Sequence, residues 1–413
     1  MQCKIIIVGA GIAGLSAAIA LRKSCHIVEI YERSSFKNEL GAAITIGPNA
    51  GRLLKLWGVD PAAARFVTSD AIRFWSYDKL EEQSFVDETH AEERFGAPLW
   101  YAHRVDLHDA LRAIATQQDG LGTPVVIHLG KPVVKYHPED ASVTLADGEV
   151  VTGDAVIAAD GVHSGAVEAV LGHPNRVMPA NSLNFIYRFL LTRSDIKPQS
   201  PASFFLRDGF EKSCTVFSDG LKRRLVYYPC RNAEVMNFGA LCYDNNLDPD
   251  ASQEDWHAPV DKSTMFKHFE GYHPTLLGTM NECTDLKGWP LLYRAPVTKW
   301  HRGNLTLTGD AAHPMLPLQG QAGCQAMEDA MALGLAFHGV RRSSQIPERL
   351  KTYESIRRNR ASLIQVLSDR GTEQGIPDDV LKYLEGQPVP SKSILFGTGG
   401  FQRFSARTDI CQC

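Results

Sequence analysis

The chain has 413 residues, of which 44% are hydrophobic and 22% charged, and 43 basic against 47 acidic residues give a net charge of −4. This composition is ordinary for an enzyme with a buried core, and the length predicts two domains that share an interface. A charge so close to balance gives no reason to expect nucleic acid or an anionic membrane surface as a partner.

The sequence also carries no sign of a membrane, secretory or metal-binding segment. It has no run of eighteen apolar residues, so we expect no membrane span. The apolar stretch near the start ends in a glycine-rich turn, which argues against a signal peptide. The nine cysteines are scattered and form no Cys-x-x-Cys pair. We therefore expect reduced thiols, a cytoplasmic location and no metal site.

The first forty residues have the pattern of a dinucleotide-binding βαβ unit. An apolar strand is predicted at residues 4–8, a helix at 15–23 and a second strand at 26–31, with a glycine-rich turn after the first strand. An acidic residue follows the second strand directly. The residues that we expect to hold the dinucleotide here are Gly9, Gly11, Ala13, Gly14, Glu32 and Arg33.

Each glycine of this turn is expected to have a different task. Gly9 makes the tight turn, Gly11 lets a pyrophosphate lie against the backbone, and Gly14 lets the helix pack closely on the sheet. The helix start presents free N–H groups and the positive end of its dipole to the phosphates. Glu32 is placed to accept hydrogen bonds from ribose hydroxyls. The glycines alone could be an ordinary turn, and the complete unit does not distinguish NAD from FAD.

Further candidate residues follow in the next hundred positions. Residues 41–50, which include Ala43, are mostly small and allow a close approach to the backbone. Arg104 stands just before a predicted helix, where its guanidinium could pair with a phosphate or simply face solvent. A buried strand predicted at 155–159 runs into Asp160. An acid in that position marks the edge of a site in open α/β sheets, although Asp160 could instead cap the next helix.

Aromatic and β-branched runs separated by turns predict a mostly antiparallel sheet between about residues 172 and 300. Such a sheet can form one wall of an aromatic-lined pocket, although most of its aromatic side chains must belong to the core. The strands of this sheet are expected at residues 185–190, 204–206, 215–217, 225–228 and 237–241.

The first fold resumes after residue 300. The expected elements are a strand at 304–308, a loop at 315–324 and helices at 325–337 and 348–367. Gly309 and Asp310 follow the strand, as Asp160 follows the earlier one. The loop is rich in proline and glycine and includes Gly320 and Gly323.

These motifs, in this order and at this spacing, resemble the group A flavin-dependent monooxygenases, and most closely their salicylate hydroxylase-like branch. The resemblance covers about residues 1–370. It implies an α/β fold in which a Rossmann-like FAD-binding domain of the p-hydroxybenzoate hydroxylase type carries an inserted antiparallel sheet for substrate and ends in helices. The expected parts are 1–171, with a short β excursion at about 69–100, for the FAD-binding domain, 172–300 for the sheet, 301–370 for the return and its helices, and 371–413 for an unassigned tail.

The resemblance implies that the dinucleotide is FAD, bound tightly but not covalently. Glu32 would hold the adenosine ribose, Arg104 would contact the cofactor, and Asp310 would bind the ribityl or pyrophosphate region. The flavin loop, residues 314–323, would lie along the isoalloxazine, and the motif at Asp160 is associated with both FAD and NAD(P)H. NAD(P)H would visit as a transient reductant. O₂ would then form a flavin C4a-hydroperoxide, which hydroxylates a phenolic or other aromatic small molecule.

Two residues of the inserted sheet are candidates for catalysis on the substrate side. Arg188 lies in an otherwise apolar predicted strand, and its charge needs either a substrate anion or an internal salt bridge. Tyr228 could hydrogen-bond a phenol oxygen or be a packed ring. His313 is expected to shape the flavin loop rather than to act as a base.

Two alternatives to aromatic hydroxylation remain open. The same flavin could epoxidise an alkene or an indole, because motifs for the cofactor do not specify the reaction. Less expected is a flavoprotein that serves as a redox sensor without a small substrate. The protein is expected to be a monomer or a homodimer.

Overall fold

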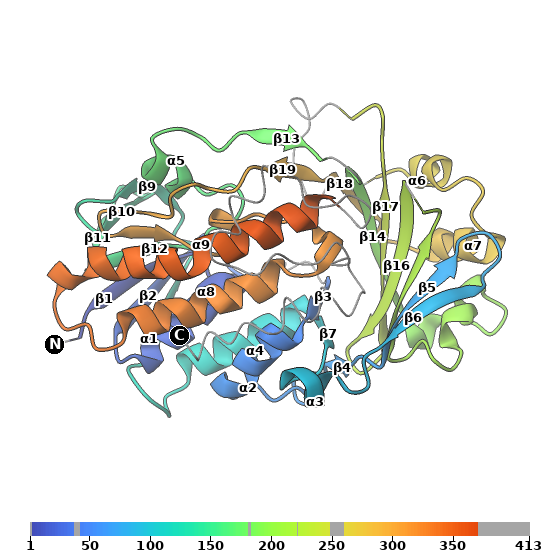
Figure 1. Ribbon diagram of the computed structural model, residues 1–413, viewed down its shortest axis with the longest axis horizontal. Helices are drawn as coiled ribbons and strands as arrows, with labels where there is room; N and C mark the ends of the chain where they lie inside the picture. Colours follow the sequence, from blue (N-terminus) through green and yellow to red (C-terminus); the bar gives the residue numbers. More distant parts are fainter. Residues whose placement is uncertain (1, 37–41, 181–182, 221, 248–259, 371–413) are drawn as a thin grey trace.

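The computed structural model describes the whole chain except residues 1, 37–41, 181–182, 221, 248–259 and 371–413, so the expected tail lies outside the described residues. Two large sheets dominate the fold, a six-stranded sheet on the left of Figure 1 and a seven-stranded sheet on the right. None of the described helices combines the length and the apolar character that crossing a bilayer requires.

The six-stranded sheet is built around the first strand of the chain. Strand β1 (Lys4–Val8) pairs in parallel with β2 (Ile27–Glu32) on one side and with β12 (Ala155–Ala158) on the other, and β12 pairs in parallel with β21 (Leu305–Leu307). The carboxyl ends of these four strands therefore meet at one edge of the sheet. The outer strands are β8 (Val126–Leu129), beside β2, and β20 (His301–Arg302), antiparallel to β21.

Helices pack on this sheet because its apolar strands must be buried on both faces. Figure 1 shows α1 (Ile12–Lys23), α8 (Ala322–Phe337) and α9 (Ile346–Arg370) stacked across it. The contact between α1 and α8 is close, since a Cβ atom at Gly334 would lie 3.0 Å from the Cβ of Ala20. The two helices predicted near the end of the chain are thus confirmed, and each is a few residues longer than expected.

The seven-stranded sheet is mostly antiparallel, as predicted, and only its β15–β5 pair is parallel. Two of its strands come from the N-terminal part of the chain, in the region expected to form a β excursion. In spatial order the strands are β18 (Lys287–Pro290), β14 (Phe185–Thr192), β17 (Val235–Cys242), β16 (Arg223–Cys230), β15 (Ser213–Ser218), β5 (Ala71–Ser76) and β6 (Glu82–Asp87).

The two faces of this sheet differ in character, because side chains alternate along each strand. One face carries most of the aromatic residues, such as Phe189 and Phe238, which stack with ring centroids 4.8 Å apart. They form a core with α6 (Lys262–His268) and α7 (Pro274–Glu282). Most aromatic side chains are therefore core, and the opposite face packs against Val67 and Tyr101 and against the loop that carries Leu316 and Leu318.

The strand expected at 204–206 is wrong, because these residues belong to a 3₁₀ helix, Pro201–Leu206. Pro201 fixes the backbone at the helix start, and the Ser200 side chain accepts a hydrogen bond from the Ala202 N–H. Phe204 and Phe205 are still buried in the aromatic core. The aromatic run thus correctly indicates that these side chains are buried, whereas the preceding Ser-Pro pair favours a helical backbone over a strand.

A small sheet of β3 (Ala43–Ile46), β7 (Trp100–His103) and β4 (Val67–Thr68) lies between the large ones. β3 leads into α2 (Pro48–Trp57), and β7 leads into α4 (Arg104–Thr116). The other elements are α3 (Ala91–Phe95), β9 (Val133–His137), β10 (Ser142–Leu145), β11 (Val150–Thr152), α5 (Ala166–Leu171), β13 (Val177–Pro179) and β19 (Leu292–Arg294), with 3₁₀ turns at Arg193–Asp195, Gly309–Ala311, Pro317–Gln319 and Ser343–Gln345.

Candidate active site

The glycine-rich turn has the geometry of a phosphate cradle. Gly9 has a φ of +97°, and a Cβ atom there would lie 2.5 Å from the Ala159 carbonyl oxygen. A Cβ at Gly14 would lie 1.9 Å from the Gly9 carbonyl oxygen, so α1 starts directly on the turn. A Cβ at Gly11 meets no atom of the described residues within 4 Å. The turn is therefore packed tightly below and open above, as a dinucleotide pyrophosphate at a helix N-terminus requires.

Glu32 lies at the end of β2, beside this turn. Its Oε2 accepts a hydrogen bond of 2.7 Å from the Ala10 N–H, and its Oε1 accepts one of 2.7 Å from the Ser34 N–H. The next side chain, Arg33, is exposed. Buried His108 of α4 contacts the Ala10 carbonyl through Nε2 at 2.8 Å and so helps to fix the turn. His108 was not predicted, because nothing local in its helix points to a residue far along the chain.

Asp160 directly follows β12 and its neighbour Ala159, beside the turn. The Tyr136 hydroxyl donates a hydrogen bond of 2.5 Å to its Oδ2. Burial raises the pKa of Asp160, and hydrogen bonds from Ser164 and Tyr136 and the charge of Arg33 oppose this shift. Asp160 is thus held in place by Tyr136 of β9, a partner that the sequence did not indicate.

Gly309 and Asp310 follow β21 in a 3₁₀ turn. Gly309 has a φ of +60°, and a Cβ there would lie 2.6 Å from the Cβ of Ala13 on the first turn of α1. Asp310 is half-buried. The structure thus brings this turn against the glycine-rich segment, although about three hundred residues separate them in the sequence. Glu32, Asp160 and Asp310 all lie at the carboxyl edge of the parallel strands.

The loop before α8 packs against β3. A Cβ at Gly320, whose φ is +62°, would lie 3.3 Å from Thr45 Cβ, and one at Gly323, which the structure places in the first turn of α8 and not in the loop, would lie 2.9 Å from Ile44 Cδ1. The loop also touches the seven-stranded sheet, because Leu316 and Leu318 share an apolar cluster with Ile186, Leu241 and Leu291. This cluster gives the loop a dry side that faces the inserted sheet.

The seven-stranded sheet meets β3 of the small sheet at the backbone of Ala43. Its carbonyl oxygen accepts hydrogen bonds from Arg188 Nη2 and, at 3.0 Å, from the Tyr228 hydroxyl. Its N–H donates to Asn237 Oδ1 at 3.4 Å, and the same oxygen accepts from Arg188 Nε and Nη2 at 3.3 Å. Burial raises the pKa of Tyr228 to about 12, although the charge of Arg188 opposes the shift. Asn237 was not predicted, and a buried amide in an aromatic strand is the signal that could have indicated it.

The hydrogen-bond partners of Arg188 are neutral. Among the described residues its guanidinium contacts the Ala43 carbonyl and the Asn237 side chain, and no carboxylate of these residues bonds to it. The internal salt bridge considered above for Arg188 is therefore not seen among the residues that the structure describes. Arg104 starts α4 and donates its N–H to the Ala42 carbonyl at 2.7 Å, and its side chain is exposed.

A cavity of about 860 Å³ lies elsewhere, where the hairpin of β16 and β17 meets β4. Its lining includes Phe66, Thr68, Arg193 and Lys212, and none of the predicted site residues. No group of three or more metal-ligating side chains occurs among the described residues. The candidate site is thus marked by the carboxylates that meet at the strand ends, and this cavity is not part of it.

Known proteins share both the sequence and the fold. A family model for an FAD binding domain matches residues 2–367. The chain is 41% identical over 389 residues to FAD-dependent monooxygenase cfoG of Aspergillus candidus, covering 94% of this chain and 89% of the relative. It is 32% identical over 394 residues to hispidin-3-hydroxylase of Neonothopanus nambi, covering 93% and 92%. A salicylate hydroxylase substrate complex, 22% identical, superposes with a TM-score of 0.74 over 98% of this chain and 97% of the other.

These likenesses confirm the expected α/β fold and its resemblance to the salicylate hydroxylase branch. The open space above Gly11 and the acid beside the turn fit an FAD molecule whose pyrophosphate lies at the start of α1. The chain belongs to the FAD binding domain family and is an FAD-dependent monooxygenase.

Proposed function

We propose that this enzyme uses NAD(P)H and O₂ to hydroxylate a phenolic or other electron-rich aromatic small molecule. The observation that carries the proposal is the convergence of Arg188 and Tyr228 on the Ala43 carbonyl, on the sheet face that meets the flavin loop. Relatives named hispidin-3-hydroxylase and 3-hydroxybenzoate 6-hydroxylase support a hydroxylation. FAD supplies the redox chemistry and activates the oxygen, and the chain supplies binding, orientation and a dry site.

The contacts assigned to FAD follow the three strand ends. The pyrophosphate would be held by Gly9, Gly11, Ala13 and Gly14, and the ribose would lie at Glu32 and Arg33. The remaining parts of the cofactor between the ribose and the flavin ring would contact Arg104, Asp160 and Asp310. The flavin ring would lie beside Ala43, Gly320 and Gly323. The apolar cluster around Leu316 and Leu318 would exclude water from the ring.

Arg188 would bind the substrate through charge. A half-buried guanidinium whose partners are neutral attracts an anion, such as a carboxylate or a phenolate on the ring. A phenolate is more electron-rich than a phenol, so a cation that favours it also promotes attack on an electrophilic oxygen. Tyr228 donates its one hydroxyl proton to the Ala43 carbonyl, so its oxygen would accept a hydrogen bond from a phenol O–H of the substrate.

The test is a panel of phenols, aromatic carboxylates, alkenes and indoles, with NADH and NADPH supplied separately. We expect some phenolic compounds to accelerate NAD(P)H oxidation and to gain one oxygen atom by mass spectrometry. Arg188→Ala should keep its FAD and lose the acceleration, whereas Arg358→Ala, an exposed arginine of α9, should keep both. Oxygen transfer to alkenes or indoles alone would select epoxidation, and NAD(P)H oxidation that no compound accelerates would overturn the proposal.

A further inference from the structure

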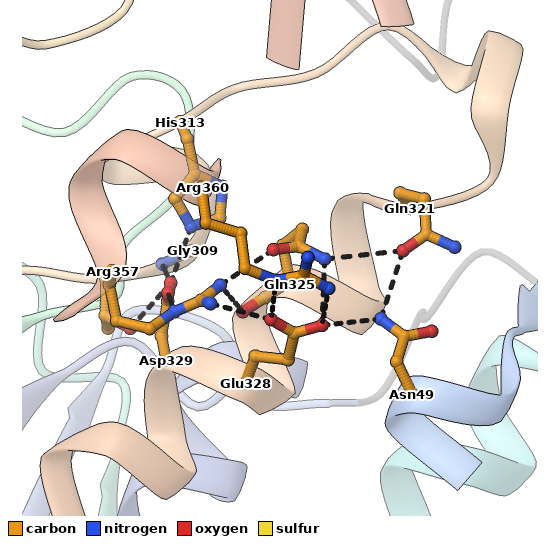
Figure 2. A network of polar contacts seen from close by, with 10 residues as sticks. Asn49, Gly309, His313, Gln321, Gln325, Glu328, Asp329, Arg357 and Arg360 are labelled. Atoms are coloured by element: carbon orange, nitrogen blue, oxygen red, sulfur yellow. Dashed lines mark hydrogen bonds and ion pairs between the residues drawn. The ribbon is translucent and has the colours of Figure 1, made fainter. Parts of the chain in front are cut away.

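A buried charge network joins the last two described helices behind the flavin loop (Figure 2). Glu328 and Asp329 of α8 face Arg357 and Arg360 of α9, and the four residues are at most 3% exposed. Burying charged groups costs several kcal/mol for each ion unless every one is well paired. Apolar residues would join two helices without that cost, so the network needs a reason other than helix packing.

Asp329 connects the helices to the Gly309–Asp310 turn. Its Oδ2 accepts hydrogen bonds from the Gly309 N–H at 3.0 Å, from the Thr308 hydroxyl at 3.4 Å and from His313 Nε2 at 2.6 Å. Its Oδ1 accepts from Arg357 Nε at 2.8 Å. One oxygen thus holds both ends of the turn after β21, and the other is held by α9 (Figure 2).

Glu328 makes the matching connection to the flavin loop. Its Oε1 accepts a hydrogen bond from Asn49 Nδ2 at 2.7 Å, and this amide also donates to Gln321 Oε1 at 3.1 Å. Its carboxylate pairs with Arg357 Nη1 at 2.6 Å and Arg360 Nε at 2.7 Å. The two arginines of α9 therefore support the loop and the turn together.

We propose that Asp329 and Arg357 are positioning residues for FAD. Gly309 is held from one side by Asp329 and packs against Ala13 on the other, in a left-handed conformation, and the next residue, Asp310, is the proposed FAD contact. Asp329 and Arg357 are fully buried behind the turn and act through it. This inference rests on the proposed contact between Asp310 and FAD, and it extends the cofactor site to a helix that starts more than thirty residues later.

The experiment measures the Kd of FAD for the apoprotein by fluorescence quenching, together with the melting temperature of apoprotein and holoprotein. Arg357→Lys cannot span both carboxylates, and Asp329→Asn keeps the side-chain volume but loses an acceptor. Each should raise the Kd about tenfold, the effect of one charge-assisted hydrogen bond, and should shrink the gain in melting temperature that saturating FAD gives. Arg358→Lys, the neighbouring arginine that pairs with Glu354 at 3.0 Å, should stay within about twofold of wild type.

The outcomes separate positioning from a purely structural role. Folded Arg357→Lys and Asp329→Asn proteins that melt earlier but bind FAD with the wild-type Kd would overturn the proposal. If Arg357→Lys does not fold, Asp329→Asn decides, and failure of both to fold even with FAD would also overturn it. Asp310→Ala is the reference variant. If Asp310→Ala binds FAD with the wild-type Kd, Asp310 does not contact FAD and the proposed cofactor contact is wrong. If Asp310→Ala raises the Kd of FAD while Arg357→Lys and Asp329→Asn do not, the contact holds and only the positioning role of Asp329 and Arg357 is wrong. None of these readouts depends on hydroxylation.

Discussion

Gly11→Ala should separate the stability of the fold from its affinity for FAD. Gly11 has a φ of −71° and a ψ of −175°, a conformation that any residue adopts, and its Cβ would meet no atom of the described residues within 4 Å. Alanine therefore fits the apoprotein without strain. The new methyl group would, however, stand in the space that the pyrophosphate needs.

The two effects have opposite signs. Replacing glycine by alanine at a compatible φ restricts the unfolded chain and stabilises a protein by about 0.4–1 kcal/mol. A pyrophosphate pushed away from the turn loses at least one charge-assisted hydrogen bond to a backbone N–H, worth about 1.5–3 kcal/mol. The Kd of FAD should therefore rise by about 10- to 100-fold while the apoprotein becomes slightly more stable.

Urea unfolding of the apoprotein and fluorescence titration with FAD measure the two terms separately. Gly165→Ala is the matched control, because Gly165 also has an ordinary φ, −70°, and open space at its Cβ. Gly14→Ala should fail to fold, since its Cβ would lie 1.9 Å from the Gly9 carbonyl oxygen. A Gly11→Ala protein that binds FAD as tightly as wild type would refute the cradle.

Three further predictions concern the acid limit of the fold and the substrate wall. Although burial opposes the shift, the charges of Arg360 and Arg357 lower the pKa of Glu328 from 4.5 to about 2. The ionised carboxylate therefore contributes about 3 kcal/mol to the free energy of unfolding above pH 4.5, and this contribution should be lost as the pH falls toward 2. Arg360→Met should reduce the loss, as measured by acid unfolding curves. Burial lowers the pKa of His103 from 6.5 to about 4, so the free energy of unfolding should fall between pH 6.5 and 4, and less in His103→Gln. Gly239 pairs with Arg188 in the sheet register, and a Cβ there would meet only methyl groups, at 3.8 and 3.9 Å. Gly239→Val should therefore keep FAD but raise the KM for substrates with large rings more than for those with small rings. An equal rise in KM for both would show that Gly239 does not line the substrate site.

The sequence predicted the parts of the site that are set by local structure. The strand at 4–8 and the acid at Glu32 follow from a strand–turn–helix–strand pattern, which local packing determines. The meeting of Asp160 and Asp310 with this turn could also be predicted, because parallel strands place their carboxyl ends at one edge.

The partners that hold these residues could not be predicted in the same way. Tyr136 reaches Asp160 across 24 positions, and Asn237 reaches Arg188 across 49. Arg357 reaches Asp329 across 28 positions, from a helix of which the sequence predicted only the approximate bounds. Such pairs depend on how elements pack, and neither spacing nor residue type within one element indicates which side chains will meet.

The position of Ala43 explains how the proposed FAD site can be linked to Arg188 and Tyr228 of the seven-stranded sheet through a backbone carbonyl and not through a shared side chain. β3 belongs to neither large sheet, yet its backbone receives Arg188 and Tyr228 from one side. Three residues past its last position, Asn49 is bonded to Glu328 of the buried network. A main-chain carbonyl accepts the same hydrogen bonds whatever its side chain is, so substitution at residue 43 would leave this junction in place. The junction instead responds to movement of β3, which is held by its pairing with β7 and by packing against Gly320 of the flavin loop and Gly323 of α8. A change that loosens the network behind the loop should therefore alter the placement of Arg188 as well as the affinity for FAD.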